Sequence, residues 1–144
     1  MYRKNVLIIE NERMVFLDLK IIFTNLGHQV IFGNNLNLEN IFKAFTTIDF
    51  IILDILSLKQ NKGLLRFAIA NYKPFQEVPI ILTSSSLKSK VQFCLTKKIN
   101  VVAELKKPYS SSQLLEIFNN TINENVSIKS PEILPLNAVQ LLTI

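Results

Sequence analysis

Four short runs of this 144-residue chain are apolar without interruption, and they constrain the fold more than any other feature. They lie at residues 6–9, 50–53, 78–82 and 101–103, and a shorter fifth run lies at 30–32. A strand with one face in water alternates apolar and polar residues, whereas a strand buried on both faces is apolar throughout. The runs therefore predict a parallel sheet that is covered on both faces.

The segments between and after these runs carry the three- and four-residue apolar spacing of amphipathic helices. This spacing recurs within residues 14–26, 38–45, 64–68, 87–95 and 114–122. Gly27 follows the first helix where a left-handed cap is expected, and Ser110 with Gln113 forms a capping box for the last one. Strand and helix thus alternate five times, and right-handed crossovers place helices on both faces. We expect an α/β fold with a doubly wound, five-stranded parallel sheet.

The chain has the length and the composition of one globular domain. Hydrophobic residues make up 49% of it and charged residues 19%. No apolar run reaches the roughly 20 residues that span a bilayer, and the first run is too short for a signal peptide. After residue 126 the helical pattern gives way to a segment interrupted by Pro131 and Pro135. We therefore assign residues 1–126 to the domain and 127–144 to a C-terminal appendage.

Cysteine and histidine each occur once. Cys94 cannot form an internal disulfide, and His28 alone offers no cluster for zinc, so we expect a cytoplasmic protein with Cys94 in its core. The formal charge of +5 is partly concentrated in one stretch, which is either a basic face for an acidic partner or a solvated surface. Because the clustering is only partial, we expect no direct nucleic-acid binding. The lysines of this stretch are Lys88, Lys90, Lys97, Lys98, Lys106 and Lys107.

Polar side chains stand at the carboxyl ends of the predicted strands, where open α/β sheets bind ligands. Glu10 follows the first run, Asp54 ends the third strand, Thr83 and Ser84 end the fourth, and Lys107 follows the fifth. Two carboxylates at one rim repel each other unless a hard cation neutralises them, and magnesium suits this task. Asp54 is then placed to attack a phosphoryl group, while the ammonium and a hydroxyl hold its oxygens.

Each of these residues also has a purely structural interpretation. Asp54 can be the N-cap of a helix, Ser84 can cap the helix that follows it, and Lys107 with Pro108 can form a simple turn. The functional interpretation depends on their coincidence at the matching ends of four separate strands.

The segments around these strand ends resemble the receiver domains of two-component response regulators, over residues 4–123. The resemblance implies a flavodoxin-like (βα)5 fold with strand order 2-1-3-4-5 and a cis peptide bond before Pro108. A flavin-binding protein of the same fold is the alternative, but an acidic segment after the first strand is wrong for flavin phosphate. The motifs are Val6-Leu7-Ile8-Ile9-Glu10-Asn11-Glu12, Asp49-Phe50-Ile51-Ile52-Leu53-Asp54, Pro79-Ile80-Ile81-Leu82-Thr83-Ser84 and Lys107-Pro108-Tyr109.

The resemblance also implies roles for individual residues. Asp54 would accept a phosphoryl group, Lys107 would pair with it, and Ser84 would hydrogen-bond a phosphoryl oxygen. Ser84 is favoured over Thr83 because the switch hydroxyl of the family lies five residues after the proline of the fourth strand. The magnesium ligands would be Glu10, Asn11, Asp54 and the backbone carbonyl of Leu56.

Several positions depart from the family's pattern. Asn11 stands where the family has an acid that contacts the metal, which predicts weakened rather than abolished magnesium binding. Glu104 replaces an aromatic that swings inward on phosphorylation. Because burying an ionised glutamate in an apolar slot is costly, we expect Glu104 to stay exposed. We also expect the coupling of phosphorylation to protein partners through Ser84 and Glu104 to differ from that of the family. Leu58 replaces the proline that the family commonly has after the phosphoryl acceptor, and Gly63 lies one residue later than in the family. We therefore expect the loop after Asp54 to have a different conformation.

The leading hypothesis is a single-domain response regulator, not a classical enzyme. A histidine kinase or phosphotransfer protein would phosphorylate Asp54, and contact with a downstream protein would carry the signal, with no role for a membrane. The alternative, motivated by Asn11 and Glu104, is a receiver-like module that binds proteins without phosphorylation. A hydrolase at this rim lacks a general base, since His28 lies at the wrong end of its strand. The resemblance also allows a homodimer, because receiver domains commonly form dimers.

Overall fold

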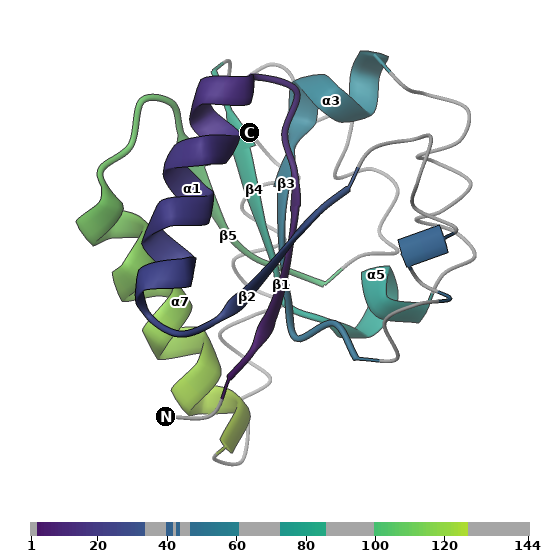
Figure 1. The fold of residues 1–144 in the computed structure, drawn as a ribbon, viewed down its shortest axis with the longest axis vertical. Coiled ribbons are helices and arrows are strands. Elements are labelled where there is room, and N and C mark those ends of the chain that lie inside the picture. Colours follow the sequence, from purple (N-terminus) through teal and green to yellow (C-terminus); the bar gives the residue numbers. More distant parts are fainter. Residues whose placement is uncertain are drawn as a thin grey trace.

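A computed structural model describes residues 3–33, 40–41, 43, 47–60, 73–85 and 100–126 of the chain. Five parallel strands form one sheet in the order β2-β1-β3-β4-β5 (Figure 1), which confirms the predicted topology. Every residue of β3 and β4 is buried, because helices or other segments cover both faces of the sheet centre. The strands are β1 (Asn5–Ile9), β2 (Gln29–Phe32), β3 (Phe50–Asp54), β4 (Ile80–Ser84) and β5 (Val101–Lys106).

Helices lie on both faces of this sheet. Helices α1 (Arg13–Asn25) and α7 (Ser111–Val126) lie side by side on one face, whereas α3 (Ile55–Gln60) and α5 (Lys73–Glu77) lie on the other (Figure 1). Edge-to-face aromatic contacts join the first pair of helices to the sheet. The ring of Phe118 lies 4.9 Å from that of Phe23 and 4.8 Å from that of Phe50, between ring centroids.

The two predicted helix-end signals are present. Gly27 follows α1 with a φ of +89°, a left-handed conformation that costs other residues steric energy. At the start of α7, the Gln113 N–H donates to Ser110 Oγ at 3.1 Å, and the Ser110 N–H donates to Gln113 Oε1 at 3.0 Å. This reciprocal pair is the predicted capping box.

The helical pattern of α1 is only partly used for the core. Of the residues predicted for its apolar face, Leu19 and Phe23 are buried, but Met14 and Leu26 are 71% and 43% exposed. The predicted apolar face was therefore too long, since its first and last residues are exposed. Other expectations lie outside the described residues: the helices at 64–68 and 87–95, the loop around Gly63, the core position of Cys94 and the appendage at 127–144.

His28 is buried at the amino end of the sheet, opposite the phosphorylation site implied by the resemblance. Its Nδ1 accepts a hydrogen bond from the backbone N–H of Lys4 at 3.1 Å, and its ring meets Phe118 edge-to-face with centroids 5.2 Å apart. Its Nε2 is buried and has no hydrogen-bond partner among the described residues. Burial and the Lys4 charge lower the pKa of His28, against a smaller opposing effect of Asp49.

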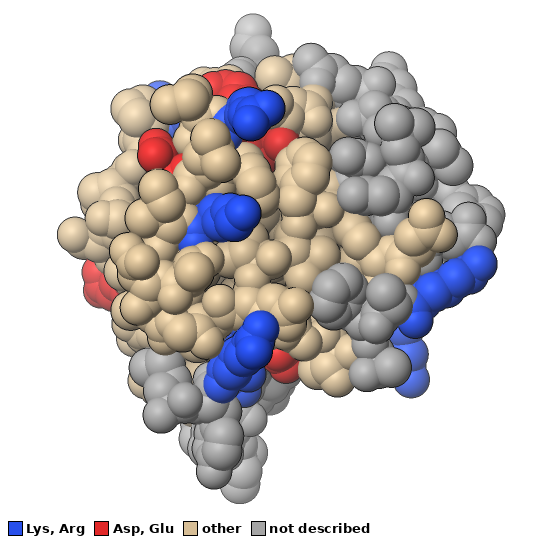
Figure 2. Space-filling view, viewed as in Figure 1, with Lys and Arg blue, Asp and Glu red and all other residues tan. Residues whose placement is uncertain are grey.

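The surface of the described residues shows no concentrated charge on the face seen in Figure 2, where lysines and arginines lie in separate groups among uncharged atoms. Four of the six lysines in the predicted basic stretch lie outside the described residues. None of the helices that the structure describes is long and apolar enough to cross a membrane.

Candidate functional site

The carboxyl edge of the sheet brings the predicted site residues together. Glu10 follows β1, Asp54 ends β3, Ser84 ends β4 and Lys107 follows β5. The strands are parallel and neighbouring, so their carboxyl ends meet at one edge. The Lys107 N–H donates to the Ser84 carbonyl at 2.7 Å, which extends the β4–β5 pairing up to the site. The Lys107–Pro108 peptide bond is cis, as the resemblance implied.

The ammonium of Lys107 connects the two buried carboxylates. Its Nζ lies 2.8 Å from Glu10 Oε1 and 3.1 Å from Asp54 Oδ1. Glu10 and Asp54 are 3% and 2% exposed, so water screens these ion pairs little. The strand order explains the geometry, because β1 and β3 are adjacent and Lys107 reaches back over β4 from the end of β5.

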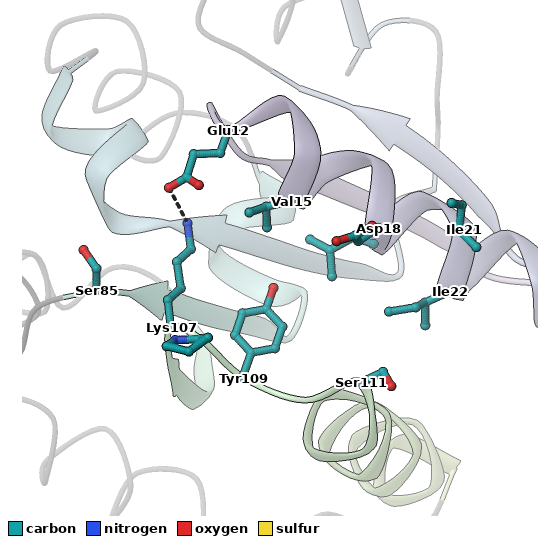
Figure 3. A pocket seen from close by; sticks show the side chains of 11 residues that line it. Glu12, Val15, Asp18, Ile21, Ile22, Ser85, Lys107, Tyr109 and Ser111 are labelled. Atoms are coloured by element: carbon teal, nitrogen blue, oxygen red, sulfur yellow. Dashed lines mark ion pairs between the residues drawn. The ribbon is translucent and has the colours of Figure 1, made fainter.

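Glu12 is a third carboxylate at this edge, and it was not among the site residues predicted from the sequence. Its Oε1 lies 3.8 Å from Lys107 Nζ (Figure 3), and its backbone N–H donates to Glu10 Oε2 at 3.1 Å. The Glu12 side chain is largely exposed, so its attraction to Lys107 is weaker than that of the buried pair. Its position two residues after Glu10 was the available sequence signal.

Ser57 is a second residue that sequence reasoning missed. Its backbone N–H and its hydroxyl both donate to Asp54 Oδ2, each at 3.0 Å. Asp54 is thus the N-cap of α3, with Ser57 at the third helical position. The structural interpretation of Asp54 therefore holds alongside its pairing with Lys107. An Asp-x-x-Ser spacing before a helix was the signal for this contact.

The electrostatics of the site favour a protonated Lys107. Burial opposes its charge, but the hydrogen bond to Glu10 and the charge of Asp54 outweigh burial and raise the pKa of Lys107. Burial raises the pKa of Glu10, and the nearby charge of Asp54 adds to this effect against the lowering by Lys107. Burial also raises the pKa of the neighbouring Tyr109 to about 12, so its phenol stays protonated at neutral pH.

Two hydroxyls end β4 beside Asp54. Thr83 is the register partner of Asp54, and its buried Oγ1 has no hydrogen-bond partner among the described residues. Ser84 is also buried and lies in register with Lys106, one residue before the site lysine. Both hydroxyls therefore belong to the edge at which Asp54 stands.

Glu104 differs from expectation. It was predicted to stay exposed, but it is partly buried, and its Oε2 atom is buried. The prediction was wrong because Glu104 lies within β5 rather than at its end, in register with the fully buried Leu82 of β4. Register partners share a sheet face, so the Glu104 side chain follows the covered face of Leu82.

The oxygen donors of the site fit a hard cation such as magnesium. Glu10 and Asp54 present carboxylates toward one point, now neutralised by Lys107, and magnesium is held by few protein ligands with water completing its shell. Asn11 is exposed beside them. Leu56 lies in the first turn of α3, where backbone carbonyls point along the helix axis. The role of its carbonyl as a magnesium ligand is therefore implied by the resemblance alone. The described residues include no cluster of three His, Cys, Asp or Glu that could hold a metal.

A groove leads away from the site between α1 and the segment that joins β5 to α7. Its volume is about 750 Å³, and Lys107 and Glu12 form its end nearest Asp54 (Figure 3). Aliphatic side chains of α1 form one wall, and Pro108 and Tyr109 form the other. The buried Tyr109 Oη has no hydrogen-bond partner among the described residues. The other lining residues are Val15, Asp18, Leu19, Ile21, Ile22, Ser85 and Ser111.

Comparison with solved structures places this fold in one class. A response regulator from Thermotoga maritima is similar over 85% of this chain and 99% of its own, with a TM-score of 0.64 and 20% identity. A signal receiver domain of an HD-domain protein from Pseudomonas fluorescens matches over 88% and 99%, with a TM-score of 0.69 and 15% identity. A signal receiver domain of a histidine kinase from Clostridium thermocellum matches over 83% and 97%, with a TM-score of 0.63 and 26% identity.

The chain therefore has the flavodoxin-like fold of response-regulator receiver domains, which confirms the predicted fold class. No protein-family model and no curated protein matches its sequence. The structural neighbours support the resemblance of the chain to receiver domains.

Proposed function

We propose that this chain is a phosphoryl-accepting regulatory domain in which Asp54 is the acceptor. The observation that carries the proposal is the Lys107 ammonium between Glu10 and Asp54, at the carboxyl edge of a receiver-type sheet. Catalysis of phosphoryl transfer consists mainly of positioning and charge stabilisation, and this arrangement supplies both.

The proposed reaction uses the ionised carboxylate of Asp54. Its Oδ1 attacks the phosphorus of a donor phosphohistidine or acyl phosphate, a new P–O bond forms, and the bond to the donor breaks with its electron pair on the donor. Lys107 lies next to Oδ1 and offsets the charge of the arriving phosphoryl oxygens. Ser84 is our candidate donor to one of those oxygens, with the unpartnered Thr83 hydroxyl as its competitor.

Magnesium is the cofactor that the donor set fits. Glu10 and Asp54 would hold it, with contributions from the Asn11 side chain and the Leu56 carbonyl as the resemblance implies. When bound, the ion neutralises phosphoryl charge at the site. Because Asn11 supplies no charge, we propose weaker binding than an all-acidic site would give.

The partners of the proposed function are proteins. A histidine kinase or a phosphotransfer protein would donate the phosphoryl group, and the groove along α1 suits such a donor because it ends beside Lys107. Met14 and Ile21 expose apolar surface at this helix, which favours contact with a protein. A downstream protein would then sense the state of Ser84 and Glu104. We propose a cytoplasmic setting for this exchange, with residues 1–126 as the acting domain.

Incubation with acetyl phosphate and magnesium tests the proposal through the intact mass of the protein. We expect a gain of one phosphoryl group in the wild-type chain and none in Asp54→Asn, which keeps the size of the side chain and its capping oxygen. Ser84→Ala and Thr83→Val form a matched pair that identifies the hydroxyl in use, because only the variant that removes it should slow phosphorylation. Equal gain in the wild type and in Asp54→Asn would exclude Asp54 as the acceptor.

The second candidate is a receiver-like module that binds proteins without phosphorylation. The observation that favours it is that both oxygens of Asp54 already have protein partners, Lys107 and Ser57. The same experiment separates the two candidates: a wild-type chain that gains no mass from acetyl phosphate, yet is folded and binds magnesium, favours the module.

A further inference from the structure

The two carboxylate oxygens of Asp54 stand in different surroundings. Oδ1 faces the Lys107 ammonium at 3.1 Å, and Lys107 in turn lines the groove. Oδ2 accepts two hydrogen bonds at 3.0 Å, from the backbone N–H and from the hydroxyl of Ser57. The two oxygens are therefore chemically distinct before any phosphoryl donor arrives.

The contact between Ser57 and Oδ2 is built into the fold. Ser57 has no exposed surface, and it lies in the first turn of α3, three residues after Asp54. The helix N-cap fixes the backbone amide against Oδ2, and the hydroxyl repeats that contact from the side chain. A phosphoryl group whose oxygens are held by Lys107 therefore bonds to Oδ1, and Oδ2 becomes the carbonyl oxygen of the acyl phosphate.

The strength of the two hydrogen bonds changes with the state of Asp54. Hydrogen bonds to an ionised acceptor are roughly twice as strong as those to a neutral one. In hydrolysis, water attacks the phosphorus, the P–Oδ1 bond breaks, and its electron pair returns to the carboxylate while the protons of water pass to the phosphate. Negative charge then develops on Oδ2, where Ser57 stabilises it.

We infer that Ser57 limits the lifetime of the phosphoryl group on Asp54, as a positioning residue whose hydroxyl makes the carboxylate a better leaving group. This inference rests on the proposed function and deepens it. The same hydrogen bonds hold Oδ1 toward Lys107, so Ser57 also selects which oxygen reacts.

The test is the decay of phosphorylated protein after removal of acetyl phosphate, followed by intact mass. We expect Ser57→Ala to lengthen the half-life about five- to tenfold, because the lost hydrogen bond is stronger to the departing, ionised carboxylate than to the neutral acyl phosphate and only this difference affects the rate. Ser57→Thr keeps the hydroxyl and should restore the wild-type decay. Ser112→Ala, on the exposed face of α7, is the matched control and should decay at the wild-type rate.

The direction of the change separates this role from a structural one. A loosened α3 would admit water and hasten decay, so slower decay in Ser57→Ala cannot come from a loosened fold. If Ser57→Ala does not fold, Ser57→Cys keeps a similar volume with a weaker donor and should lengthen the half-life by a smaller factor.

Two negative results have different meanings. A wild-type chain that takes up no phosphoryl group on Asp54 overturns the proposed function and this inference with it. A wild-type chain that is phosphorylated on Asp54, with unchanged or faster decay in the folded Ser57 variants, overturns the inference alone.

Discussion

The ammonium of Lys107 lies 3.1 Å from Asp54 Oδ1, although these residues come from the ends of β5 and β3, with β4 between them. The same nitrogen lies 2.8 Å from Glu10 Oε1, so one cation compensates two buried carboxylates. Removing it leaves two like charges facing each other in a poorly solvated site.

We expect Lys107→Met to lower the free energy of unfolding by about 2 to 3 kcal/mol at neutral pH, less than the loss typical of a deeply buried pair. Urea unfolding measures the change, and Lys106→Met is the matched control because its side chain is exposed at the adjacent position. The deficit should shrink at acid pH, because burial raises the pKa of Glu10 and its carboxylate loses its charge on taking up a proton. A deficit equal to that of Lys106→Met would show that the carboxylates do not depend on Lys107.

Glu10→Gln removes one of the two buried charges but preserves the size of the side chain. Loss of an outer-shell partner alone lowers metal affinity about 10- to 100-fold, so loss of a ligand should weaken magnesium binding at least about tenfold. Calorimetric titration of the wild type should show saturation below tens of millimolar, and Glu12→Gln should weaken binding less. No saturable binding in the wild type, or equal effects of the two variants, would contradict the assignment of Glu10.

His28 predicts a pH dependence of stability from the opposite end of the sheet. Its pKa is lowered in the folded state, so the unfolded chain binds more protons below its ordinary pKa of about 6.5. Stability is therefore full above that pH and is lost as the pH falls through it. Because the chain has one histidine, His28→Gln should flatten the loss between about pH 7.5 and pH 5.5. An unchanged slope would show that His28 is accessible to protons when folded.

Gly27→Ala tests the end of α1. The φ of +89° is unfavourable for an L side chain, while no atom lies within 4 Å of the position of an added Cβ. The cost is thus conformational alone, about 1 to 2 kcal/mol in thermal or urea unfolding. Gly27→Asn should cost less, because asparagine tolerates this conformation better. Equal losses in the two variants would point to a packing cause instead.

Much of the fold could be predicted because its signals are local. The apolar runs marked all five strands. The structure extends four of them by one to three residues, as in β5 (Val101–Lys106), and shifts the fourth from residues 78–82 to β4 (Ile80–Ser84). The capping box of Ser110 and Gln113 was readable from spacing, as was the left-handed cap at Gly27. The strand order came from the resemblance, since the runs themselves specify no order.

The site was predictable only in part, because side-chain pairing depends on three-dimensional approach. The parallel sheet implied that Glu10, Asp54 and Lys107 share one edge, but spacing could not show that Lys107 contacts both carboxylates. The burial of Glu104 was missed because it depends on register with Leu82 of another strand. Ser57 was overlooked because the structural and chemical interpretations of Asp54 were treated as alternatives, whereas the structure combines both.

The most direct test of the account is to locate the phosphoryl group chemically. Borohydride reduces an aspartyl phosphate to homoserine, so the protein is incubated with acetyl phosphate and magnesium, reduced, digested and sequenced by mass spectrometry. The account predicts homoserine at position 54 of the wild-type chain and at no position of Asp54→Asn. Unmodified aspartate at position 54 in the folded, magnesium-treated wild type, or homoserine at another position, would contradict the central claim.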